Sequence, residues 1–167
     1  MADKAASSKA APSAAINSGA WWGYHLAYAG ITAAMVLPQF GAAYGTSMSA
    51  SALTTLSGGP DGKVMKGMIP IVMSGVIALY GLGGAIFMHR KAQKDAELPS
   101  NGAKYLAAGL SLGLACLASG YAIGQVGNAG LTEYAKRDDF FVPTVLSLIY
   151  GEALGLYGAI AAYFLLK

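Results

Sequence analysis

One acidic residue, Glu152, stands alone in a long apolar segment. It is the only charged residue between Phe140 and Leu166, and a helix needs roughly 20 apolar residues to cross a bilayer. The carboxyl group therefore falls near mid-membrane, where ionisable side chains face a protein interior, a partner or an ion path. Lipid favours the neutral acid, whereas water or a cation favours the carboxylate. A carboxyl group that alternates between these surroundings would carry a proton. The structural alternative is an acid that stays protonated and forms a hydrogen bond across a helix interface.

Few other polar groups are available to share an ion with Glu152. Tyr150 and Ser147 carry the nearest hydroxyls in the sequence, and Ser74 and Ser119 could approach from neighbouring helices. A sodium ion needs several oxygen ligands to replace its water shell, and this set is thin. The sequence therefore favours a proton, with sodium as the alternative, and it predicts no cofactor and no metal centre.

The composition indicates a protein that lies almost wholly in the membrane. Of the 167 residues, 55% are hydrophobic and 11% are charged, whereas soluble domains carry roughly 25% charged residues. The chain has no basic stripe of the kind that binds nucleic acid. Residues 1–19 are rich in Ala and Ser and lack the apolar core of a secretory signal, so we expect a flexible tail there.

The remaining residues predict an all-α membrane protein with four transmembrane helices in two hairpins. A turn rich in Gly and Pro separates the first two spans, and charged segments separate the others. The predicted boundaries are a first hairpin at 20–90 with spans 21–56 and 65–88, a polar loop at 91–103, and a second hairpin at 104–167 with spans 104–130 and 140–166.

The two hairpins resemble each other in sequence, which indicates an internal duplication. The motif Gly41–Gly45 recurs loosely as Gly120–Gly124, 79 residues later, and Ala78–Gly81 recurs as Gly155–Gly158, 77 residues later. With the second offset, the position that matches Glu152 in the first hairpin is Gly75. One copy thus carries an acid and the other lacks it.

Glycines four residues apart occur in three of the four predicted spans. Small residues at this spacing let helices approach closely in lipid, where van der Waals contact drives association. The sequence therefore predicts tight helix packing, either in a compact four-helix monomer or around the axis of a ring. The pairs are Gly41/Gly45, Gly109/Gly113, Gly120/Gly124 and Gly151/Gly155.

These motifs, taken together, resemble the c-type proteolipid of the V-type (vacuolar) rotary proton ATPase. The resemblance covers all four helices, from about Gly41 to Leu166, and the order of the motifs and the position of the acid agree. Asn128 departs from the usual Asp of that family. The matching segments are Gly41–Thr46, Met65–Met73 through Gly81, Gly120–Gly124, Val126–Gly130, and Glu152 with Leu154–Gly158.

The resemblance implies an oligomeric ring of such proteolipids, homomeric or with paralogues, in a vacuolar or other acidic endomembrane compartment. The first and third helices would line its inside, and the second and fourth would face lipid. Glu152 would carry one proton per copy of the chain past an Arg of the neighbouring stator protein. Central-stalk proteins would turn the ring, and other parts of the complex would hydrolyse ATP. The alternative from another class is a structural or pore-forming ring, which needs no titrating acid.

Overall fold

The computed structural model describes residues 21–58 and 61–167, which are almost entirely helical and contain no strand. The tail expected at residues 1–19 lies outside the described residues. In chain order the elements are α2 (Trp21–Leu53), the 3-10 helix η1 (Thr54–Leu56), α3 (Asp61–Gly67), α4 (Ile69–Lys94), α5 (Leu98–Lys136), the 3-10 helix η2 (Asp138–Phe140) and α6 (Phe141–Leu166).

The described residues contain four helical segments that are long and apolar enough to cross a membrane. They are Trp21–Leu56, Gly62–Lys94, Leu98–Lys136 and Asp138–Leu166, which confirms the prediction of an all-α fold with four spans. The last three run past the predicted spans because charged residues at a helix end can reach water without interrupting the backbone hydrogen bonds.

The connection between the second and third spans is much shorter than the polar loop predicted at residues 91–103. Only Asp95–Glu97 lie outside the two helices, because α4 continues to Lys94 and α5 begins at Leu98. The Asp95 carboxylate closes the turn by accepting hydrogen bonds from the Glu97 amide at 3.0 Å and the Asn101 side chain at 3.2 Å. The charged residues around this turn are therefore mostly helical. The polar sequence of the stretch indicates that it lies in water, not that it forms a loop.

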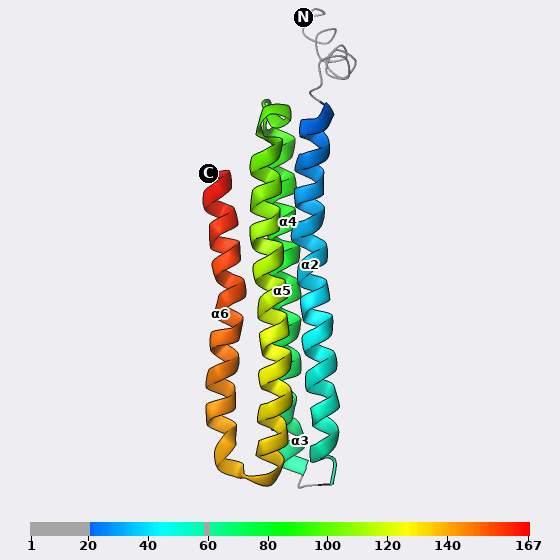
Figure 1. The fold of residues 1–167 in the computed structure, drawn as a ribbon, viewed down its shortest axis with the longest axis vertical. Coiled ribbons are helices and arrows are strands. Elements are labelled where there is room, and N and C mark those ends of the chain that lie inside the picture. Colours follow the sequence, from blue (N-terminus) through cyan, green and yellow to red (C-terminus); the bar gives the residue numbers. More distant parts are fainter. Residues whose placement is uncertain (1–20, 59–60) are drawn as a thin grey trace, which may run out of the picture.

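The four long helices run side by side, with α5 between α2 and α6 in the view of Figure 1. The α2 helix makes its most extensive contacts with α5, α4 packs mainly on α2, and α6 packs mainly on α5. The contact between α4 and α6 is much less extensive than these three. Two hairpins are thus joined through α2 and α5, which leaves a groove between α4 and α6.

Glycines on α2 and α5 lie opposite each other at positions that the internal repeat relates. A Cβ atom on Gly102 would overlap the backbone of Gly23, one on Gly109 that of Gly30, and one on Gly120 that of Gly41. A Cβ atom on Gly124 would lie 3.0 Å from the Cα of Gly45, and one on Gly113 would lie 2.8 Å from the carbonyl oxygen of Ala33. Backbones at this separation admit no side chain, so the glycines set the distance between α2 and α5.

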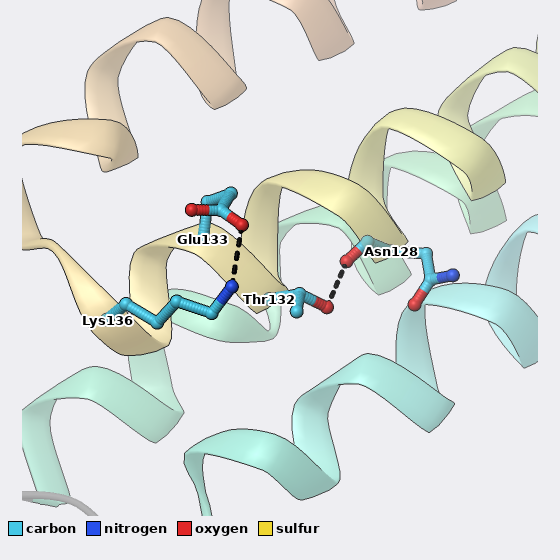
Figure 2. Close-up of polar contacts among 4 residues, drawn as sticks. All are labelled: Asn128, Thr132, Glu133 and Lys136. Carbon is cyan, nitrogen blue, oxygen red and sulfur yellow. Dashed lines mark hydrogen bonds and ion pairs between the residues drawn. The ribbon is translucent and has the colours of Figure 1, made fainter.

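Ion pairs gather at the end of the molecule where α3 lies and where α5 turns into α6. Lys136 Nζ contacts Glu133 Oε1 at 2.8 Å, and one turn earlier the Thr132 hydroxyl donates to the Asn128 carbonyl at 2.8 Å (Figure 2). Lys63 Nζ lies 2.7 Å from Asp138 Oδ1, which ties the start of the second span to the start of the fourth. These basic and acidic residues therefore neutralise one another at this end.

Candidate functional site

Glu152 lies near the middle of α6, half-buried in the groove between α4 and α6. A hollow of about 300 Å³ contains its side chain and is lined also by Tyr80, Ile149, Ala153 and Leu156. Apart from the carboxyl group and the tyrosine hydroxyl, these side chains are apolar. The acid is therefore open toward the surroundings of the molecule on one side and contacts protein on the other.

One hydrogen bond holds the carboxyl group in this groove. The Tyr80 hydroxyl on α4 donates to Glu152 Oε1 at 3.0 Å. Among the described residues, Glu152 forms no ion pair with a Lys, Arg or His side chain. A cation that favours the carboxylate would therefore have to come from outside the described residues, for example from water or from another protein.

Tyr80 is absent from the candidates that the sequence indicates, although it lies inside the repeated stretch Ala78–Gly81. The signal that could have indicated it is the repeat itself, which pairs Tyr80 on one helix with Tyr157 on the helix of Glu152. Tyr157 is 61% exposed, so the two related tyrosines have different surroundings. The acid occurs in one copy of the repeat, and the tyrosine that contacts it belongs to the other.

Gly151 and Gly155 bring the backbone of α6 close to α5 on the two sides of Glu152. A Cβ atom on Gly151 would lie 3.3 Å from Ile123 Cγ1, and one on Gly155 would lie 3.2 Å from Ser119 Oγ. The buried Ser119 hydroxyl donates to the Gly151 carbonyl at 2.6 Å. Ser119 thus fixes the backbone next to the acid and does not contact the carboxyl group itself.

Ser74 and Gly75, the expected neighbours of the acid on α4, differ from each other in what surrounds them. The buried Ser74 hydroxyl donates to the carbonyl of Ala42 at 2.9 Å and so joins α4 to α2. Gly75, the position that the repeat relates to Glu152, has no atom within 4 Å of a Cβ built on it. Ser74 therefore helps to position α4, whereas the space beside Gly75 is open.

The two hydroxyls nearest to Glu152 in the sequence do not reach its carboxyl group. The Ser147 hydroxyl donates to the Pro143 carbonyl of its own helix at 3.0 Å. Tyr150 is 76% exposed and points away from the other helices of the molecule. Within the part of the chain that the structure describes, Tyr80 is thus the sole side chain that supplies a hydrogen bond to the acid.

The chain is similar in sequence to several known proteins. The family model for the C subunit of ATP synthase matches residues 106–165, which include Glu152. The chain is 44% identical to the c′ subunit of the V-type proton ATPase of Eremothecium gossypii over 139 residues, 83% of this chain and 85% of that protein. It is 43% identical to the human 16 kDa proteolipid of the V-type proton ATPase, the c subunit, over 148 residues, 89% of this chain and 95% of that protein.

Proposed function

The chain belongs to the family of c and c′ proteolipids of V-type proton ATPases, and on that premise we propose that it is a proton-carrying member of the rotor ring of such an ATPase. The observation that carries the proposal is the half-buried carboxyl group of Glu152 at the middle of an apolar helix, with the Tyr80 hydroxyl at 3.0 Å. The chain itself does not hydrolyse ATP, which is the task of other members of the complex.

The proposed cycle uses the two states of one carboxyl group. Glu152 takes up a proton from one aqueous half-channel and travels through lipid as the neutral acid, since the ionised form is costly there. At the stator, water and an Arg of the stator protein favour the carboxylate, and the proton leaves to the other side. The Tyr80 hydroxyl can donate to the carboxylate and to the carbonyl oxygen of the acid, so it can hold the side chain in both states.

The ring is proposed to place α2 and α5 inside and α4 and α6 outside. This placement is compatible with the large apolar side chains exposed on α4 and α6, which lipid or a neighbouring copy would cover; they include Val72, Leu79 and Ile86 on α4 and Leu146, Ile149 and Ile160 on α6. Large apolar side chains are also exposed on α2 and α5, where neighbouring copies would cover them. The partners are further copies of this chain, alone or with paralogous proteolipids, together with the central stalk and the stator protein. The membrane is that of a vacuole or another acidic endomembrane compartment.

The surroundings of Glu152 favour a proton over sodium. A sodium ion would need several oxygen ligands in place of its water. In the described residues, Ser119 and Ser74 donate to backbone carbonyls of other helices, and Tyr80 is the remaining oxygen that contacts the acid. One carboxyl group and one hydroxyl can hold a proton, but they leave a sodium ion with few ligands.

Replacement of the acid in the assembled ATPase tests the proposal. Glu152→Gln removes the group that ionises and keeps its size, so ATP-driven acidification of vesicles should fall to background. Glu97→Gln, at an exposed residue just before α5, is the matched control and should acidify as the unaltered complex does. Acidification that survives Glu152→Gln would overturn the proposal. A pore-forming ring would instead keep its pore activity in this variant, because a pore needs no titrating acid. Protection of Glu152 from a carbodiimide by sodium would favour the sodium carrier.

A further inference from the structure

A groove lined with basic side chains lies where α6 ends beside α4 and α5. In Figure 1 the end of α6 stops short of the turn between α4 and α5, so these two helices extend past it. Two adjoining hollows occupy this step, with volumes of about 460 and 450 Å³, and both are lined by Lys91, Lys94 and Lys167. Lys104 lines the first hollow and Arg90 the second. We call the two hollows together the basic groove.

The basic groove continues into an apolar crevice between α4 and α6. This crevice has a volume of about 170 Å³ and shares Phe87 and Tyr163 with the basic groove, while its other end reaches Tyr80. The Phe87 and Tyr163 rings lie 5.6 Å apart and join the two helices across it. A ligand that fills both parts would need a charged head and an apolar chain.

The cations of the basic groove lack acidic partners, unlike three of the cations at the other end of the molecule. Near α3, Lys63, Lys136 and Arg137 each lie within 2.8 Å of a carboxylate oxygen. Among the described residues, none of the five cations of the basic groove forms an ion pair, and the carboxylate that lines it, Asp95, accepts hydrogen bonds from Asn101 and Tyr105. The basic groove is therefore suited to an anion from outside the chain.

The position of the basic groove along α6 matches the depth of the lipid headgroups. With Glu152 near mid-membrane, Tyr163 lies 11 residues further along, or about 16 Å at 1.5 Å per residue. That is close to half of the roughly 30 Å hydrocarbon thickness, and the headgroup layer begins there. Lys167 lies about 22 Å from Glu152 on the same scale. Phe87 and Tyr163 would thus contact acyl chains, and Lys91, Lys94 and Lys167 would lie among the phosphates.

We propose that this groove binds one anionic phospholipid of the surrounding bilayer. Its phosphate and headgroup contact Lys91, Lys94 and Lys167, and an acyl chain lies between Phe87 and Tyr163 in the crevice that leads to Tyr80. The basic side chains and the crevice act together, so binding exceeds the general attraction of a basic surface for anionic lipid. Binding at this site does not require Glu152 to carry a proton.

The test uses the purified ring reconstituted in phosphatidylcholine vesicles that contain spin-labelled phosphatidylserine or spin-labelled phosphatidylcholine. Electron paramagnetic resonance measures the fraction of each lipid that the protein immobilises. We expect a preference for phosphatidylserine of roughly fivefold or more, since each Lys near a membrane surface contributes about 1 kcal/mol to anionic lipid binding. The variant Lys91→Gln/Lys94→Gln/Lys167→Gln should lower this preference to near unity.

A charge-matched control variant carries Lys66→Gln/Lys136→Gln/Arg137→Gln at the other end of the molecule and should keep the preference. Ala159→Leu narrows the crevice without changing a charge and should weaken it. The proposal is overturned if the groove variant keeps the preference, if the control loses it equally, or if Ala159→Leu has no effect. It is also overturned if inorganic phosphate releases phosphatidylserine more effectively than sulfate at equal ionic strength, because a free anion would then fill the site.

Discussion

The Tyr80 hydroxyl lies 3.0 Å from Glu152 Oε1, so a residue of the first hairpin contacts the acid of the second. Both side chains are half-buried in the groove between α4 and α6. The contact makes the position of the carboxyl group depend on both hairpins. A duplicated chain can therefore lose one acid and still use both copies to hold the other.

Tyr80→Phe should slow proton transport without preventing assembly of the ring. The change removes one hydroxyl and leaves the ring of the side chain in place. A hydrogen bond to a charged group contributes roughly 1.5–3 kcal/mol, and the partly open groove lets other donors replace some of it. We expect ATP-driven acidification by the assembled complex to fall roughly threefold to tenfold, since 1.4 kcal/mol corresponds to a factor of about ten.

Tyr157→Phe is the control for this measurement, because the repeat relates Tyr157 to Tyr80 and Tyr157 is 61% exposed. Its acidification rate should equal that of the unaltered complex. Equal losses in the two variants would show that the Tyr80 hydroxyl has no special part in holding the acid.

The fold is largely predictable from the sequence. The length of an apolar segment determines whether its helix can span the membrane, and the spacing of glycines determines where two helix backbones can approach each other. Four spans follow from four long apolar segments, and the offset between Gly41 and Gly120 indicates which glycines face each other across α2 and α5. The turn at Asp95–Glu97 is shorter than predicted because polar residues continue a helix in water as readily as they form a loop.

The partners of the carboxyl group are harder to predict, since they depend on how each helix is rotated about its axis. Ser119 is a predicted neighbour of Glu152, and it donates instead to the carbonyl of Gly151, one residue earlier. Tyr150 is near the acid in sequence, yet it lies on a different face of α6. Tyr80 contacts the acid from 72 residues away, and hydropathy patterns contain no information on such a pair.

Ser119→Ala should destabilise the fold because it removes a buried hydrogen bond between α5 and α6. The expected loss in the free energy of unfolding is about 1 kcal/mol, the usual contribution of one such bond. Ser147→Ala is the matched control, since that exposed hydroxyl bonds only to its own helix, and its effect should be near zero. Unfolding of the purified protein in mixed micelles measures both, and a larger loss for Ser147→Ala would contradict the assignment.

Gly120→Ala should destabilise the packing of α2 against α5. A Cβ atom there would overlap the backbone of Gly41, which cannot move aside as a flexible side chain can. We expect the free energy of unfolding to fall by about 1–3 kcal/mol or more, as in other overpacked interiors. The measurement is thermal unfolding of the purified protein in detergent.

Gly83→Ala tests whether that loss comes from the interface or from glycine replacement as such. No atom lies within 4 Å of a Cβ atom at Gly83, and alanine favours a helix over glycine by roughly 1 kcal/mol. The variant should therefore be as stable as the unaltered protein or slightly more stable. A loss in Gly83→Ala as large as that in Gly120→Ala would rule out the close approach to Gly41 as its cause.

Gly75→Glu should give the first hairpin an acid of its own. The repeat relates Gly75 to Glu152, and no atom lies within 4 Å of a Cβ atom built there, so the side chain fits without displacing a neighbour. A ring built only from copies of this variant, with two carriers in each, would move about twice as many protons per turn. The same free energy of ATP hydrolysis is then divided among more protons, and each proton costs about 1.36 kcal/mol per unit of pH difference. The largest attainable pH difference should therefore fall by about half.

Carbodiimide should label both positions. The control Gly75→Gln adds similar volume without an acid and should leave the limiting pH difference unchanged. If Gly75→Glu is labelled at both positions and the limiting pH difference stays the same, the number of acids in each copy of the chain does not set the number of protons carried per turn.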